Sequence, residues 1–257
     1  MKNSRHNRTK KWLWIGISIL VLAVLIGVCA IYLANYYHAD MAAIEAAFPA
    51  ERGISEQTLD NGDMVFSAAH AKIGLIFYPG GKVEHTAYIP LMRTLAKSGV
   101  CCVLCKMPFR LAVFDLHAAD AAREALPDVE TWYIGGHSLG GVMAASELAA
   151  HEGAYGGLIL LGSYTTEDLS NAPVRALSIY GSEDRVLNRD KYAASKGNMP
   201  QDATEHVIDG GCHAYFGMYG RQDGDGEPTI SNEAQIRITA ETVLAWMNEG
   251  GAYAQNP

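Results

Sequence analysis

The chain contains two kinds of apolar segment. Residues 12–34 form one long run without a charged residue, whereas the later runs are short and alternate with stretches whose apolar residues recur at helical spacing. Short continuous apolar runs are typical of strands buried on both faces, and the stretches between them predict helices that cover the sheet. We therefore predict an α/β domain over residues 57–257, with a mostly parallel central sheet and helices on both of its faces.

The first two strands of this domain are expected to form a hairpin. Asp60-Asn-Gly-Asp63 is a strong turn signal, because Asn-Gly accepts positive φ angles. Ligands of parallel sheets bind beyond the carboxyl ends of the strands, so the residues that follow each strand are the candidates for chemistry. Strands are expected at 57–59, 64–68, 73–78, 100–106, 132–134, 157–162, 175–181 and 205–208, and helices at 86–98, 114–126, after Ser138 and at 231–249.

The long apolar run predicts a membrane-spanning helix over Trp12–Ala34, because about 20 such residues cross the hydrocarbon layer. Basic residues crowd positions 1–11, and aromatic residues lie at both ends of the run, as they do at membrane interfaces. We expect a single-pass anchor in the cell membrane, with the tail in the cytoplasm and the domain outside the cell or in the periplasm. A cleaved signal peptide is the alternative, although its apolar core is usually shorter. Residues 35–56 are expected to form a helical stalk.

The net negative charge of the chain argues against some classes of binding partner. The chain carries 20 Lys and Arg against 28 Asp and Glu, and five of the basic residues precede Trp12, so the remainder is strongly acidic. An acidic domain repels phosphate backbones, which argues against nucleic acid as a partner, and it does not bind anionic lipid by charge alone.

The five cysteines do not predict a disulfide framework. Cys101 and Cys105 share one face of an expected strand but lie roughly 13 Å apart, beyond disulfide reach, and Cys102 faces the other way. Cys29 falls in the membrane segment. No set of cysteines and histidines has the spacing of a zinc site, so we expect buried small side chains and no metal.

The segment Gly136-His-Ser-Leu-Gly140 fits the Gly-x-Ser-x-Gly nucleophile elbow. A buried aromatic strand precedes it and an alanine-rich helix follows it, which is the context that this motif requires. The turn places Ser138 on a strained backbone at a helix N-terminus, where free amide groups favour developing negative charge. Ser138 is the candidate nucleophile.

A serine hydroxyl needs a base to take its proton and an acid to orient that base. The order expected after this elbow is acid and then histidine. Asp184 follows the strand at 175–181 and is the candidate acid, with Glu183 as the alternative. His213 follows the last strand in a glycine-rich loop and is the candidate base, whereas His206 is expected to lie within that strand.

Two neighbours of these residues invite other interpretations. His137 precedes the nucleophile, but adjacent side chains on a sharp elbow point apart, so a packing role is expected. Cys212 and His213 are sequence neighbours that rarely face each other, and we interpret Cys212 as structural.

An oxyanion hole requires amide groups aimed at the position where negative charge develops. The N–H of Leu139, directly after the nucleophile, is one expected donor. The second is expected from the loop Pro79-Gly-Gly-Lys-Val83, with Gly81 favoured and Lys82 as the alternative.

These segments together resemble the α/β-hydrolase superfamily, in its compact type similar to dienelactone hydrolases and small carboxylesterases. The resemblance covers roughly residues 57–250 and implies about eight strands, a Ser-His-Asp triad and no metal or organic cofactor. Dienelactone hydrolases use cysteine as the nucleophile, so a serine here favours ordinary ester chemistry. The segments that carry the resemblance are Tyr78-Pro-Gly-Gly81, Gly136-His-Ser-Leu-Gly-Gly141, Gly181-Ser-Glu-Asp184 and Gly211-Cys-His213.

The sequence thus predicts a membrane-anchored serine hydrolase acting on a small or extended ester. Only about a dozen residues separate Gly162 from the next strand, too few for an inserted cap domain. Acyl transfer or amide cleavage by the same residues remains an alternative, as does an envelope-tethered binding domain with a vestigial pocket. The sequence indicates no oligomeric state.

Overall fold

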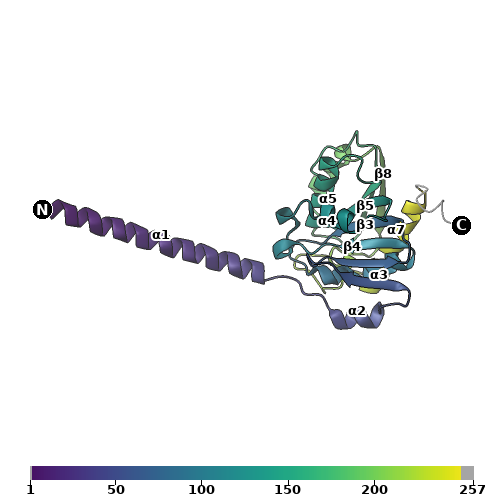
Figure 1. The fold of residues 1–257 in the computed structure, drawn as a ribbon, viewed down its shortest axis with the longest axis horizontal. Helices are drawn as coiled ribbons and strands as arrows, with labels where there is room; N and C mark the ends of the chain where they lie inside the picture. Colours follow the sequence, from purple (N-terminus) through teal and green to yellow (C-terminus); the bar gives the residue numbers. More distant parts are fainter. Residues whose placement is uncertain (1, 250–257) are drawn as a thin grey trace. The chain divides into compact units, whose positions relative to one another are not determined.

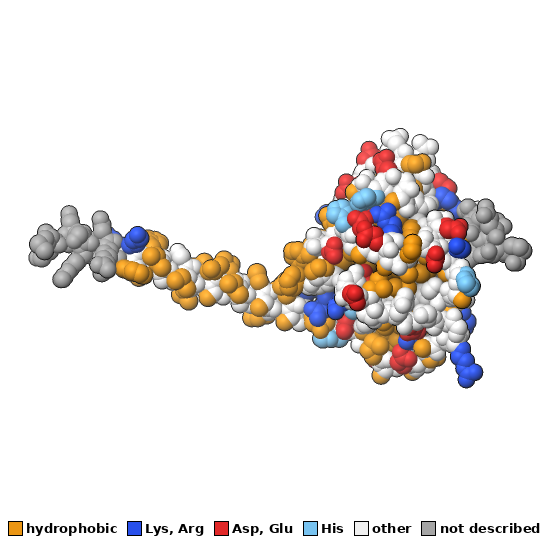
Figure 2. All heavy atoms as spheres, viewed as in Figure 1, with side chains coloured by type: hydrophobic (Ala, Val, Ile, Leu, Met, Phe, Trp, Pro, Cys, Tyr) orange, Lys and Arg blue, Asp and Glu red, His pale blue; other side chains and the backbone are white. Residues whose placement is uncertain are grey.

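A computed structural model of the protein describes the backbone of residues 2–249 and the side chains of residues 10–249. Helix α1 spans Lys2–Ala34, and its part from Lys10 onward is long and apolar enough to cross a membrane. Hydrophobic side chains line this part along its whole length (Figure 2), and none of them is buried. Such a helix is compatible with a single-pass anchor and also with a signal sequence.

Within residues 37–249, eight strands form one sheet in the order β1-β2-β4-β3-β5-β6-β7-β8 (Figure 1). Strand β2 runs antiparallel to β1 and β4, and the remaining pairs are parallel. The expected hairpin and the mostly parallel sheet are therefore confirmed. The strands are β1 (Ile54–Thr58), β2 (Met64–Ala68), β3 (Ile73–Tyr78), β4 (Val100–Leu104), β5 (Thr131–His137), β6 (Gly157–Leu161), β7 (Arg175–Gly181) and β8 (Asp202–Ile208).

Helices cover both faces of the sheet, as predicted. Side chains alternate along the central strands: Leu75 and Phe77 pack toward α2, α3 and α7, whereas Ile76 and Tyr78 pack toward α4 and α5. Every residue of β3 is buried, which explains its continuous apolar sequence. The helices are α2 (Met41–Ala47), α3 (Ile89–Lys97), α4 (Ala118–Ala125), α5 (Leu139–Ala150), α6 (Arg189–Ser195) and α7 (Asn232–Glu249), with 3₁₀ turns η1 (His85–Tyr88), η2 (Pro108–Arg110), η3 (Ala112–Phe114), η4 (Lys196–Asn198) and η5 (Ala214–Phe216).

The segment expected as a stalk, residues 35–56, differs from that expectation. The compact unit that contains the sheet begins at Tyr37, and α2 belongs to it. Ile44 of α2 and the following Phe48 are buried in the core, and Arg93 of α3 donates hydrogen bonds to Glu45 and to the Phe48 carbonyl. The apolar residues that suggested a helix here pack on the domain, because they cover apolar surface that α3 and the sheet leave open.

The carboxyl ends of the parallel strands lie along one edge of the sheet and position the site. The register pairs Tyr78 with Gly136, His137 with Leu161, and Gly181 with Ile208. The loops that follow β3, β5, β7 and β8 therefore emerge at the same edge. The loops that carry the sequence-predicted site residues are among them.

Candidate active site

Ser138 occupies the sharp turn between β5 and α5. Its backbone has φ 51° and ψ −122°, a region that residues other than glycine rarely adopt. Two hydrogen bonds hold the turn: the Ser138 N–H donates to the Leu161 carbonyl at 2.9 Å, and the Ser163 hydroxyl donates to the Ser138 carbonyl at 2.7 Å. A Cβ on Gly140 would lie 2.2 Å from the Tyr78 carbonyl oxygen, so only glycine lets helix and strand approach this closely.

His213 and Asp184 form the second part of the site. The His213 ring nitrogen Nδ1 lies 2.8 Å from Asp184 Oδ2, and both side chains are buried. The other carboxylate oxygen, Oδ1, accepts the N–H groups of Val186 at 2.9 Å and Leu187 at 2.8 Å. These two amides fix the carboxylate, so that Oδ2 is aimed at the imidazole.

The alternative candidates do not make this contact. The Glu183 carboxylate interacts with the Ser182 hydroxyl and with Arg185, on the outer side of the loop. His206 lies within β8, as expected for a sheet residue. Cys212 is fully buried and burial raises the pKa of its thiol to about 12, so it remains a neutral thiol.

The glycine after β6, Gly162, is a site residue that our sequence interpretation missed. It has φ 52°, and a Cβ there would lie 2.9 Å from His213 Nδ1 and 3.1 Å from Asp184 Oδ2. Any larger residue would press on the His–Asp pair. A glycine directly after a buried strand was the available signal, but it is also an ordinary strand ending.

His137 packs beneath the imidazole of His213, with ring centroids 4.5 Å apart. Its Nδ1 lies 2.7 Å from the Tyr88 hydroxyl, which in turn accepts the Gly80 N–H at 3.1 Å. Complete burial, together with the like charge that His213 would carry, lowers the pKa of His137 well below its ordinary value. His137 is therefore neutral and joins the elbow to the loop after β3.

The loop after β3 contains three successive backbone N–H groups, those of Gly80, Gly81 and Lys82, and two of them donate hydrogen bonds within the domain. The Gly80 N–H donates to Tyr88, and the Lys82 N–H donates to the Arg110 carbonyl at 2.9 Å. Among the described residues the Gly81 N–H has no acceptor, and a Cβ on Gly81 would lie 3.0 Å from the Leu139 side chain. Gly81 thus lies against the first residue of α5, whose own N–H points out of the helix end.

A cavity of about 230 Å³ lies at the elbow, and both Ser138 and His213 line it. The buried His213 Nε2 has no hydrogen-bond partner within the described part of the chain. The geometry therefore offers a hydroxyl, an oriented imidazole with an available nitrogen and the Leu139 amide around one small space, and the uncommitted Gly81 amide lies next to Leu139. The other lining residues are Leu139, Val142, Gly162, Ser163, Tyr164, Val186, Leu187 and Asn188.

Asp225 is a second residue that the sequence interpretation missed. Its carboxylate accepts the N–H groups of Ala214 at 2.8 Å and Arg185 at 3.3 Å, so it bridges the loops of His213 and Asp184. Burial raises the pKa of Asp225, but backbone hydrogen bonds from Ala214, Gly226 and others outweigh burial and lower it. No local motif marks this residue, because it approaches the site only through the fold.

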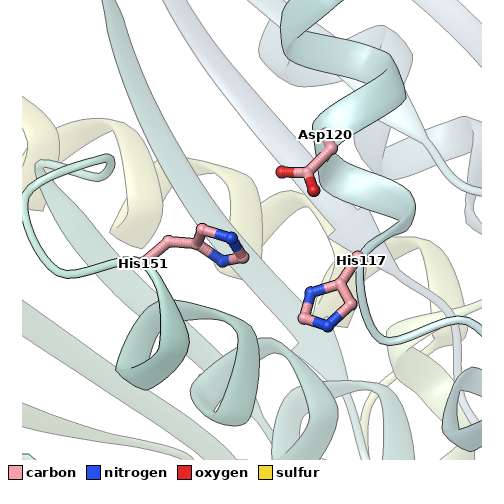
Figure 3. Close-up of side chains that lie close together, drawn as sticks. All are labelled: His117, Asp120 and His151. Carbon is pink, nitrogen blue, oxygen red and sulfur yellow. The ribbon is translucent and has the colours of Figure 1, made fainter.

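His117, Asp120 and His151 offer ligand atoms that lie within 4.8 Å of one another (Figure 3). His151 directly follows the last residue of α5, twelve residues beyond Leu139, so the group lies about 20 Å along the helix from Ser138. Both imidazole Nδ1 atoms contact the buried Glu147 carboxylate, and Asp120 pairs with Arg123. Arg123 is therefore the cation that pairs with the carboxylates of Asp120 and Glu147. These contacts join α4 to α5 at a distance from the elbow.

Comparisons with known proteins identify the family of this chain. A family model described as the alpha/beta hydrolase family matches residues 74–237, which include the elbow, Asp184 and His213. No curated protein matches the chain.

Two solved structures show the same fold. A predicted CIB-like hydrolase from Thermoplasma acidophilum is 18% identical with a TM-score of 0.52, over 74% of this chain and 97% of that one. Est1E from Butyrivibrio proteoclasticus is 14% identical with a TM-score of 0.55, over 78% of this chain and 99% of that one. At these identities the likeness concerns the fold alone.

Proposed function

Because this chain belongs to the alpha/beta hydrolase family, we propose that it is a membrane-anchored serine hydrolase that cleaves a carboxylic ester. The observation that carries the proposal is the buried contact between His213 and Asp184, at the sheet edge where Ser138 occupies a strained elbow. A histidine oriented in this way beside a serine is the arrangement that activates a hydroxyl for acyl transfer.

In the first half-reaction, the Ser138 Oγ attacks the ester carbonyl while His213 Nε2 takes the hydroxyl proton. Asp184 accepts the Nδ1–H of His213 and stabilises the imidazolium that forms. The N–H groups of Leu139 and Gly81 bind the oxyanion. The proton then passes from His213 to the leaving alkoxide, which departs as an alcohol and leaves Ser138 acylated.

In the second half-reaction, water takes the place of the alcohol. His213 removes a proton from the water as it attacks the acyl carbonyl, and the collapse of the second oxyanion returns the proton to Ser138. The products are the carboxylic acid and the free enzyme.

The proposed location follows from helix α1. Its apolar part, Lys10–Ala34, would remain in the membrane as an anchor, with the basic residues before Trp12 in the cytoplasm. The acidic domain would then face the outside of the cell or the periplasm.

An activity-based probe tests the nucleophile. A fluorophosphonate phosphonylates an activated serine with loss of fluoride, so it should label the wild-type chain, and Ser138→Ala should abolish the labelling. Ser170→Ala, in the loop after β6, is the matched control and should be labelled like wild type. Mass spectrometry of the adduct identifies the site. An unreactive wild type, or an adduct on another serine, would contradict the proposal and favour a binding domain.

A further inference from the structure

The exposed apolar side chains of the domain are not scattered. Six large hydrophobic side chains between residues 37 and 249 are more than one-third exposed, and four of them fall within residues 109–116. Phe109 and Phe114 are the most exposed of the six, each at 58%, and their rings contact each other edge to face at 5.6 Å. The other two are Val113 and Leu116. We call residues 108–116 the apolar loop.

The backbone of the apolar loop is ordered by hydrogen bonds, so its exposed side chains are held outward. The N–H groups of Arg110, Leu111 and Phe114 donate to carbonyls three residues earlier, within η2 and η3. The buried Ala112 anchors the loop to the domain. Two adjacent residues, Phe109 and Arg110, have positive φ angles of 52° and 61°, a conformation that costs free energy.

The apolar loop borders the proposed oxyanion hole. The Arg110 carbonyl accepts the Lys82 N–H at 2.9 Å, and a Cβ on Gly81 would lie 3.6 Å from the Leu111 side chain. A cavity of about 390 Å³ separates Phe109 from Pro79 and is also lined by Lys106 and Arg110. The apolar loop thus contacts the loop that carries Gly81, the proposed second oxyanion donor.

The chain that leads from helix α1 attaches beside the same loop. The Tyr37 N–H donates to the Lys82 carbonyl at 2.8 Å, and the Glu84 N–H donates to the Tyr37 carbonyl at 2.9 Å. Only Asn35 and Tyr36 separate Tyr37 from Ala34, the last residue of α1. Three peptide steps reach at most about 11 Å, so the length of the tether alone keeps this part of the domain near the end of the apolar helix, whatever its orientation.

We propose that the apolar loop docks on the membrane in which helix α1 is anchored, and that the enzyme takes its ester from a lipid-like amphiphile of that membrane. Phenylalanine side chains on a short loop enter the boundary between headgroups and acyl chains. Asp115, within the loop, limits the contact to headgroup depth. The cavity beside Ser138 holds only a short part of an acyl chain, so the rest of the substrate stays in the leaflet.

This inference rests on the proposed anchor and on the proposed hydrolase chemistry, and its first test measures contact with lipid alone. The full chain carrying Cys29→Ser and Phe114→Cys is labelled with an environment-sensitive fluorophore and reconstituted in phosphatidylcholine vesicles. The remaining cysteines are fully or almost fully buried and do not compete for the label. Val207→Cys on β8, 43% exposed, is the matched control.

The label at position 114 should shift to shorter wavelength and be quenched by lipids that carry a quencher in the upper acyl chain. The label at position 207 should show neither effect. Equal behaviour of the two labels would overturn the docking proposal, because both positions are exposed and apolar.

The second test separates docking from catalysis. The double variant Phe109→Ser/Phe114→Ser should lose roughly tenfold or more of its rate on a long-chain ester held in vesicles. Its kcat/KM for a water-soluble acetyl ester should stay within about twofold of wild type, because neither ring touches the reacting atoms. Val207→Ser should leave both rates unchanged.

The outcomes for the two proposals are distinct. If wild type cleaves both esters and the double variant cleaves the vesicle-borne ester as fast as wild type, the docking proposal is wrong and the hydrolase proposal stands. If wild type cleaves neither ester and does not react with a fluorophosphonate, the hydrolase proposal itself is wrong. The melting temperature of the double variant should match that of wild type, since both substituted side chains are exposed.

Discussion

Asp184 uses its two carboxylate oxygens for different purposes. Oδ1 accepts two backbone N–H groups, from Val186 and Leu187, and Oδ2 contacts His213. Glu183, one residue earlier, has a longer side chain that is one-third exposed and interacts with Arg185. A shift of one residue along the chain therefore decides that Asp184, and not Glu183, can orient His213.

The first prediction at the residue scale separates these two acids. Asp184→Asn keeps the shape of the side chain but favours the wrong tautomer of His213, so kcat should fall by roughly 10² to 10⁴. Glu183→Gln removes a solvated charge and should change kcat/KM by less than about tenfold. Steady-state kinetics on a soluble ester measure both. If Glu183→Gln instead shows the large loss of kcat and Asp184→Asn retains the activity of wild type, the acid is misassigned.

The candidate residues that could be predicted from the sequence were those that lie in a motif or follow a predicted strand in the expected order. Ser138 lies in a recognisable elbow, and Asp184 and His213 follow strands in the expected order. Gly162 and Asp225 could not be found in this way, because their contacts depend on how distant loops meet. Residues that react can therefore be predicted from their order in the sequence, whereas residues that position them, such as Gly162 and Asp225, are found only in the folded structure.

At the scale of elements, Asp225 joins two loops that the sheet only brings near each other. It accepts N–H groups from Ala214, at the start of η5, and from Arg185, in the loop before α6. Because the folded-state pKa of Asp225 lies below its ordinary value, its charged form stabilises the protein fully above about pH 4. That stabilisation is lost as the pH falls through the folded-state pKa.

Asp225→Asn should therefore lower the free energy of unfolding at pH 7 by about 1.5–3 kcal/mol, the range for hydrogen bonds to a charged group. The variant should also lose less stability than wild type when the pH is lowered below 4. Urea unfolding at pH 7 and at acidic pH measures both effects. Unchanged stability at pH 7, or the same acid dependence as wild type, would show that the charge of Asp225 does not hold these loops.

The strands at the centre of the sheet were predicted well, because most of their residues are buried. Residues 73–78 and 175–181 were expected as strands and are strands with these bounds, because continuous apolar residues require cover on both faces. Helix α6 was not expected, since it is short and carries mainly polar residues. Residues 41–48 have a helical pattern that fits a free stalk and a packed helix equally, and only the apolar surface of α3 decides between them.

The whole molecule combines one apolar helix, α1, with an acidic domain, and the prediction at this scale concerns its topology. Protease added to intact cells should digest or release the domain and spare residues 1–11, because the basic tail before Trp12 is expected to stay inside. Antibodies against tags at the two ends, one on each side of the membrane, measure the result. A mature protein that begins beyond Ala34 would instead establish a signal peptide.

Strand β4, near the middle of the sheet, carries Cys101 and Cys102, and Cys105 directly follows it; all three are free and buried. Burial raises the pKa of the thiols of Cys101, Cys102 and Cys105, so the folded domain protects them from oxidation. Under the proposed topology the chain would emerge unfolded into an oxidising compartment, where disulfides form within seconds to hours. Folding would then compete in time with oxidation, and only a chain that closes its sheet first would keep these thiols in the reduced form that its core requires.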